Sequence, residues 1–207
     1  QLANDANFYY SYVKMSFASQ GYYSGDKIMD PESYSNFMIA GTNPTTSGDI
    51  IIRNQPTDSN GANIPSQKIF LTGYTLGARM NGSGGIQENW NHPKTWNLYG
   101  STNDTSWTLL DQQVGFYFTK TSHSFEASSN EAYDYFKLEI LDISALNSSG
   151  NASADQRIQL GYISFSGSET RTTTISTELA FDDINTLTVS NIPEGATSVE
   201  LFRDTGN

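Results

Sequence analysis

Residues 93–111 constrain the fold more than any other stretch, because they carry two tryptophans in alternating runs. Trp96 and Leu98 alternate with more polar neighbours, and Trp107 and Leu109 do the same further on. A polar stretch rich in turn-forming residues, 101–106, separates the two runs. This pattern predicts two antiparallel strands joined by a tight turn. We expect both indoles and both leucines to face one core between β-sheets.

The same stretch, PKTWNLYGSTNDTSWTLLD, resembles the discoidin family, also called the coagulation-factor type C domain. The family pattern is close to P..W.L.GSNDG..W..LD, and this chain matches it without a gap at Pro93, Trp96, Leu98, Gly100, Ser101, Trp107, Leu110 and Asp111. At the turn, Asn103-Asp104 replace the usual Asp-Gly, and both residue types tolerate a positive φ. The resemblance implies a non-catalytic, antiparallel β-sandwich of the jelly-roll, galactose-binding-like type.

Composition agrees with an all-β chain and limits its partners. Of 207 residues, 12 are Tyr and 11 are Phe, Cys is absent, and the formal net charge is -11. Aromatic residues together with abundant Ser, Thr, Asn and Gly favour strands joined by long polar loops. The negative charge opposes binding to nucleic acid, and no apolar run is long enough to cross a bilayer. We therefore expect no nucleic-acid partner and no membrane insertion.

The pattern divides the chain into three segments. Residues 1–19 are rich in Phe and Tyr and form either a first strand or an arm that docks on a neighbouring subunit. Residues 20–167 form the discoidin-like sandwich. Residues 168–207 contain short β-like runs and predict either edge strands or the start of a second module. The abrupt ending leads us to expect a fragment of a longer protein.

One Gly-rich loop is the best candidate for ligand binding. Residues 81–92 join two predicted strands, and loops on a rigid sandwich commonly carry binding residues. Trp90 can stack on a sugar ring, while Arg79, Asn91 and His92 bond the hydroxyls of the sugar. The alternative is that Trp90 covers the edge of the core and His92 is an ordinary loop residue.

The resemblance also implies a structural Ca²⁺ ion. The family often holds this ion in a loop that corresponds to the region of Asp30 and Ser33, which would supply oxygen ligands. A second acidic ligand of the family has no counterpart here, because Gly161-Tyr162 stand at its position. The alternative is that Asp30-Pro31 simply starts a turn.

Two further kinds of motif bear on function. Sequons for N-glycosylation lie in predicted loops or turns, at Asn81, Asn103, Asn147 and Asn151. The sequence contains no Gly-rich phosphate loop, no H-x-x-x-H and no G-x-S-x-G elbow. We therefore expect no enzymatic activity.

These observations together predict a non-catalytic carbohydrate-binding or adhesion module of a surface protein. Its partners would be glycans or glycoproteins, and its location would be extracellular or on a virion. A competing hypothesis is a structural capsid or fibre assembly module that contacts neighbouring virion or surface subunits without a sugar ligand. A third hypothesis is an accessory binding module of a larger enzyme.

Overall fold

The structure, a computed structural model, describes residues 12–19, 28, 38–54, 65–80, 83–86, 91–145 and 154–168. The strands in these ranges are β1 (Tyr12–Met15), β2 (Met38–Ile39), β3 (Gly48–Arg53), β4 (Phe70–Gly77), β5 (Pro93–Ser101), β6 (Thr108–Gln113), β7 (Ser122–Glu126), β8 (Tyr135–Ile143), β9 (Gln159–Leu160) and β10 (Tyr162–Ser168). The described ranges contain no α-helix, and hence no helix able to cross a membrane.

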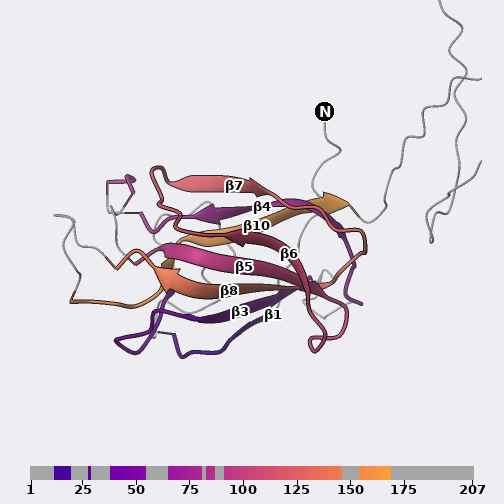
Figure 1. Cartoon of the computed structure of the whole chain (residues 1–207), viewed down its shortest axis with the longest axis horizontal. Coiled ribbons are helices and arrows are strands. Elements are labelled where there is room, and N and C mark those ends of the chain that lie inside the picture. Colours follow the sequence, from indigo (N-terminus) through magenta and orange to yellow (C-terminus); the bar gives the residue numbers. More distant parts are fainter. Residues whose placement is uncertain are drawn as a thin grey trace, which may run out of the picture. The chain divides into compact units, whose positions relative to one another are not determined.

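Two antiparallel sheets make up the sandwich (Figure 1). One has five strands in the order β1-β3-β8-β5-β6, and the other has three in the order β10-β4-β7. β2 and β9 form a separate short pair. The all-β antiparallel sandwich expected from the sequence is thus confirmed.

The core between the sheets is centred on Trp96 of β5, which is fully buried together with Leu98. The indole Nε1 of Trp96 donates a hydrogen bond of 2.8 Å to the hydroxyl of Tyr74, which in turn donates to Asp111 at 2.6 Å. Burial and the bond to Asp111 raise the pKa of the Tyr74 hydroxyl, so this group remains a donor. The chain of bonds joins β5, β4 and β6 across the core. Phe116 and Phe125 pack edge-on against the indole.

The second half of the predicted hairpin faces the other way. Leu109 is 53% exposed, so its assignment to the core is wrong. Trp107 is only partly buried, and the Nζ of Lys137 lies 5.1 Å from its ring centroid. The cause is a register shift in the β5–β6 pair, which places Leu109 opposite Tyr99 on the outer face of the sheet. An irregularity of this kind changes which side chains face the core.

The turn after β5 has the backbone conformation that its sequence predicts. Asp104 has a φ of 57°, which confirms that the turn uses the positive φ that Asn103-Asp104 can tolerate. β8 alternates between buried and partly exposed side chains, with Phe136, Leu138 and Ile140 in the core. Phe116 and Phe118 lie in irregular chain between β6 and β7.

The chain divides into two units, Gln1–Thr170 and Arg171–Asn207, and every described residue lies in the first. Most of the predicted segment 168–207 and the first residues of the predicted arm 1–19 lie outside the described residues. The three-part division therefore stays a prediction.

Gly77, at the end of β4, makes room for an aromatic ring from the neighbouring strand. It pairs with Tyr162 of β10, and a Cβ at Gly77 would lie 2.1 Å from Cδ1 of that ring. We expect Gly77→Ala to destabilise the fold by about 1–3 kcal/mol, because the ring must move. Urea denaturation of Gly77→Ala, Tyr162→Ala and the double variant measures this coupling. Gly77→Ala should cost little once Tyr162 is alanine, and an equal cost in both backgrounds would contradict the steric explanation.

Candidate functional site

Arg79, Asn91 and His92, three of the predicted binding residues, lie together at one end of the sandwich, which we call the Arg79 end. β4 finishes there at Gly77, and β5 begins there at Pro93, opposite the last residue of β8, Ile143. The arrowheads of β4, β6 and β8 all point to this end, at the left of Figure 1. Antiparallel pairing therefore brings the segments after β4 and before β5 together.

Arg79 is held from two directions. Its backbone N–H donates to Nε2 of His92 at 3.1 Å, and its NH1 donates to Oε1 of Gln159 at 2.7 Å. Gln159, the first residue of β9, is fully buried, whereas Arg79 is partly exposed. Arg79 is therefore the member of this group whose side chain is both fixed by the fold and open to solvent.

Asn91 ties the loop before β5 to the segment before β9. Its φ is 56°, its Nδ2 donates to the carbonyl of Asp155 at 2.7 Å, and its own carbonyl accepts from the N–H of Gln159 at 3.0 Å. A positive φ is uncommon outside glycine, and Asn is one of the residue types that adopt it most readily. This residue type thus suits the conformation as well as the contacts.

Some buried amide atoms at this end have no hydrogen-bond partner. They include Oδ1 of Asn91 and Nε2 of Gln159. The side-chain amide of Gln159 cannot simply be reversed, because its oxygen is needed to accept from Arg79. Unpaired buried polar groups are costly in a folded protein, so a pair at one place calls for a physical reason.

His92 is neutral at physiological pH in this arrangement. Burial and, secondarily, the positive charge of Arg79 lower its pKa from 6.5 to about 4. Neutral Nε2 is an acceptor for the N–H of Arg79, which agrees with this protonation state. The ring lies 5.1 Å from that of Phe118, so His92 also belongs to the core.

The structure gives the predicted binding residues different roles from those expected from the sequence. It brings Arg79, Asn91 and His92 together, but Asn91 is only 1% exposed and His92 only 2%. They support Arg79 and are not surface donors, because both side chains are almost fully buried. Trp90 lies outside the described residues, and glycan binding by the group stays a prediction.

Several other predicted residues lie outside the described ranges. They are the calcium ligands Asp30 and Ser33 and the sequon residues Asn81, Asn147 and Asn151. The sequon residue Asn103 is described: it is exposed, and its Oδ1 accepts from the N–H groups of Thr105 and Ser106. Within the described ranges, no three His, Asp or Glu side chains are grouped to hold a metal ion.

Gln159 was missed by the sequence analysis, although it is the residue that fixes the guanidinium of Arg79. The one signal is its position between Ile158 and Leu160, two aliphatic residues that are also buried. A polar residue inside an apolar strand is informative because burial without a partner is costly. Its partner, however, lies 80 positions away in the sequence and could not be inferred.

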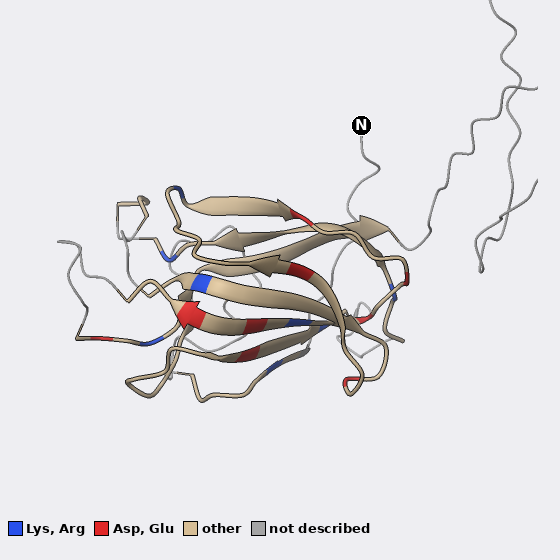
Figure 2. Ribbon diagram, viewed as in Figure 1, with Lys and Arg blue, Asp and Glu red and all other residues tan. Residues whose placement is uncertain are grey.

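An ion pair between Arg157 and Asp155 also lies at this end. Arg157 donates to both carboxylate oxygens of Asp155, at 2.6 and 2.7 Å, and this contact lowers the pKa of Asp155. Over the described ribbon, basic residues are interspersed with acidic ones (Figure 2). A surface of this kind suits a neutral ligand better than a polyanion, which needs a continuous basic stripe.

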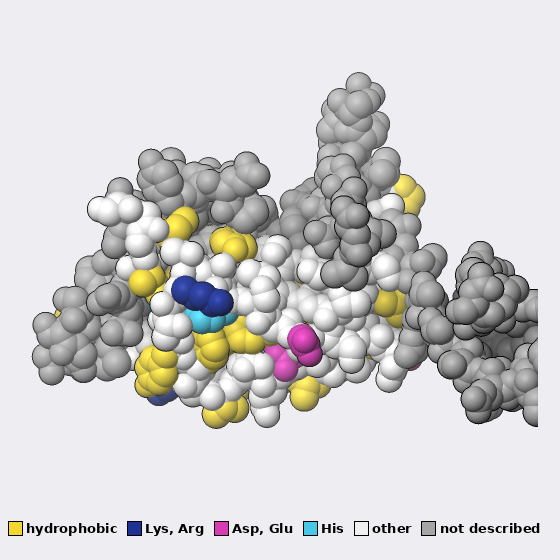
Figure 3. Space-filling view, turned by 90° about the horizontal axis from the view of Figure 1, so that it is seen from above, with side chains coloured by type: hydrophobic (Ala, Val, Ile, Leu, Met, Phe, Trp, Pro, Cys, Tyr) yellow, Lys and Arg dark blue, Asp and Glu magenta, His cyan; other side chains and the backbone are white. Residues whose placement is uncertain are grey.

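His123 of β7 contacts the same Phe118 ring as His92 does, with ring centroids 5.4 Å apart. Figure 3 shows a histidine beside a basic side chain, above hydrophobic side chains. His123 accepts from the N–H of Thr119 at 3.2 Å and packs against Phe116 with ring centroids 4.9 Å apart. Partial burial and the charge of Lys120 lower its pKa. Among the described residues, neither histidine is hydrogen-bonded to a carboxylate, so no acid–base pair is formed there.

Comparison with known proteins identifies the fold. No protein-family model matches the chain, and no curated protein matches it. The similar solved structures include CBM32-3 from a family 31 glycoside hydrolase of Clostridium perfringens, with a TM-score of 0.54, 11% identity, and coverage of 75% of this chain and 88% of that chain. A family 32 carbohydrate-binding module of Streptococcus pneumoniae EndoD gives a TM-score of 0.51 and 14% identity, covering 74% of this chain and 92% of that chain.

A third similar structure contains CBM32-1 and CBM32-2 of Clostridium perfringens ZmpB in complex with GalNAc. It gives a TM-score of 0.53 and 11% identity, and covers 76% of this chain but only 33% of that chain. The class defined by these likenesses is the galactose-binding-like β-sandwich, the fold of family 32 carbohydrate-binding modules. Those neighbours are non-catalytic modules, and some of them are parts of enzymes.

Proposed function

We propose that this chain is a non-catalytic carbohydrate-binding module that recognises a neutral sugar at the Arg79 end. The observation that carries the proposal is a partly exposed arginine, Arg79, which is held in place by buried groups next to unpaired amide atoms of Asn91 and Gln159. A fixed donor at a loop-bearing end of a rigid sandwich is suited to orient a hydroxyl-rich ligand. The fold likeness to carbohydrate-binding modules, one of them in complex with GalNAc, supports the same class of ligand.

In this proposal Arg79 makes the direct contact. Its guanidinium presents several N–H donors in one plane, and Gln159 uses only one of its nitrogens. Asn91 and His92 are positioning residues, since both are buried beneath it. Trp90 supplies the stacking face, as expected from its place in the Gly-rich loop.

Glycan-array screening followed by calorimetry tests the proposal. We expect Arg79→Ala to weaken binding by about 10- to 100-fold, because hydrogen bonds to a charged group contribute about 1.5–3 kcal/mol. Trp90→Ala should weaken the same interaction. The matched control is Lys120→Ala, which removes an exposed cation at the same end without touching the Arg79 contacts. A wild-type chain that binds no glycan, or an Arg79→Ala variant that binds normally, would contradict the proposal.

We also propose that the module belongs to an extracellular or surface protein. Because similar modules are parts of enzymes, an accessory role in a larger enzyme is the favoured context. The sequence of the complete gene product tests this directly: a catalytic domain beside the module supports it. Assembly on a virion or fibre remains the alternative from the sequence, and a strictly monomeric chain in light scattering would count against it.

A further inference from the structure

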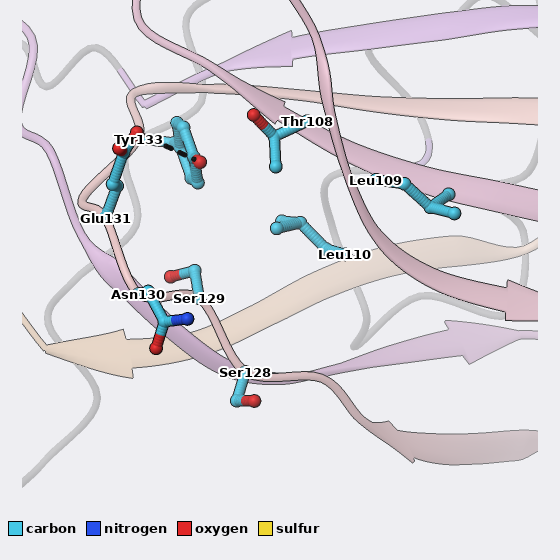
Figure 4. A pocket seen from close by; sticks show the side chains of 8 residues that line it. All are labelled: Thr108, Leu109, Leu110, Ser128, Ser129, Asn130, Glu131 and Tyr133. Atoms are coloured by element: carbon cyan, nitrogen blue, oxygen red, sulfur yellow. Dashed lines mark hydrogen bonds between the residues drawn. The ribbon is translucent and has the colours of Figure 1, made fainter.

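A hollow lies at the end of the sandwich opposite to the Arg79 end, between the start of β6 and the connection from β7 to β8. Its volume is about 290 Å³. Figure 4 shows side chains from both segments around the space. The residues that matter for its chemistry are Thr108, Leu110, Ser129, Asn130, Glu131 and Tyr133.

The walls of this hollow are fixed by the fold. Tyr133 is only 4% exposed, and its ring occupies the space beside Gly100, where a Cβ would lie 2.4 Å from Cδ2 of the ring. The backbone of Tyr133 is paired in both directions with Ile69. Ser129 is buried, and its Oγ accepts from the N–H of Leu71 at 2.8 Å. Groups held in this way lose little freedom when a ligand binds.

The hollow presents hydroxyl and carboxylate groups beside two leucines, Leu109 and Leu110. Ser129 accepts from the backbone, so its hydroxyl proton remains available to donate. Tyr133 donates to Oε2 of Glu131 at 3.3 Å, and the other carboxylate oxygen can accept from a ligand. Thr108 adds a hydroxyl, and both Thr108 and Leu110 point from β6 toward Tyr133 and Ser129 (Figure 4).

This chemistry matches a small neutral polyol ring. Leu110 offers an apolar surface for C–H groups, and the surrounding donors and acceptors suit hydroxyls. The volume of about 290 Å³ lies at the lower limit of small-molecule sites, roughly 300 Å³, which fits a single sugar ring better than an oligosaccharide. Glu131 and the net charge of -11 disfavour uronic or sialic acids through like-charge repulsion.

We propose that the hollow is a second glycan site, specific for one neutral glycosyl unit. It shares no residue with the Arg79 end and lies at the far end of the strands, so each site can bind or fail independently of the other. Because the two sites lie at opposite ends of one rigid body, they would allow the chain to bridge glycans on two separate surfaces, but not to bind one flat surface through both sites.

Amide NMR spectra of the ¹⁵N-labelled 207-residue chain test the proposal. The probes are the methyl glycosides of galactose, glucose and mannose at millimolar concentrations, with glucuronate as the anionic comparison. We expect at least one neutral sugar to shift the amides of Thr108, Ser129 and Glu131, and glucuronate to leave them unchanged. Repeating the titration with Arg79→Ala separates the two sites, because the shifts at the hollow should persist.

Variants of the hollow complete the test. Thr108→Val removes a hydroxyl at nearly constant volume, and Glu131→Gln keeps an acceptor for Tyr133 but removes the charge. Each should weaken binding at the hollow by about 5- to 20-fold, the loss expected for one hydrogen bond to a ligand. The matched control is Thr102→Val, an exposed threonine at the same end but outside the hollow. The proposal of a second site would be overturned by any of three results. These are amide shifts confined to the Arg79 end, no amide shifts at all, or variants of the hollow that bind like the wild type.

Discussion

Replacing Trp96 with alanine is expected to destabilise the protein by about 3–5 kcal/mol, the range for removing a fully buried large aromatic side chain. The indole is completely buried and contacts both Phe116 and Phe125. Its loss also leaves the hydroxyl of Tyr74 without its donor. Total stabilities of folded domains are about 5–15 kcal/mol, so this loss would be a large fraction of the free energy of unfolding. Urea denaturation followed by circular dichroism measures the change.

Trp107 provides the matched control for this experiment. It is the same residue type in the same hairpin, but it lies on the outer face beneath Lys137. We expect Trp107→Ala to cost only about 1 kcal/mol, from a partly exposed ring and one cation–π contact. Equal losses for the two variants would show that both indoles are in the core, contrary to the structure.

Lowering the pH from 7 to 4 is expected to remove about 3 kcal/mol of stability through His92 alone. Its pKa is about 4 in the folded chain and 6.5 ordinarily, and each pKa unit corresponds to about 1.4 kcal/mol. The unfolded chain takes up a proton below pH 6.5, whereas the folded chain resists it until about pH 4. The contribution is therefore complete above pH 6.5 and is lost as the pH falls toward 4.

The comparison that isolates this effect is His92→Gln, which keeps a side-chain acceptor but does not titrate. Unfolding free energies of both proteins should be measured at several values between pH 7 and 4. The wild type should lose stability more steeply than the variant over this window, while His123→Gln should retain most of the wild-type slope, since His123 is far less buried. Parallel curves for the wild type and His92→Gln would mean that the burial of His92 has no energetic effect.

Much of the fold followed from local patterns in the sequence. Alternation alone placed Trp96 and Leu98 in the core, because both lie on one uninterrupted stretch of β5. The same reasoning failed for Leu109, because a register shift inside the β5–β6 pair is not visible in the spacing of apolar residues. The spacing of apolar residues shows which side chains of one strand share a face. It does not show which of the two faces of the strand is buried in the core.

The candidate sites were less predictable, because they depend on contacts between distant segments. The loop position of Arg79 and His92 suggested that they meet, but the burial of His92 depends on Phe118 from another connection. The hollow at the far end involves β6 and residues 128–133, and its lining of Ser, Thr and Asn looks like an ordinary loop composition. Only the packing of Tyr133 over Gly100 distinguishes it, and that contact has no local signature.

The pairing of the outermost strands also has a geometric consequence. β1 begins at Tyr12, opposite Arg53, and β10 finishes at Ser168, opposite Phe70, so the first described strand begins and the last described strand finishes at the same end of the sandwich. That end is the one remote from Arg79. A support attached at these two points would leave the Arg79 end facing outward. The hollow beside Tyr133 would then lie next to the attachment.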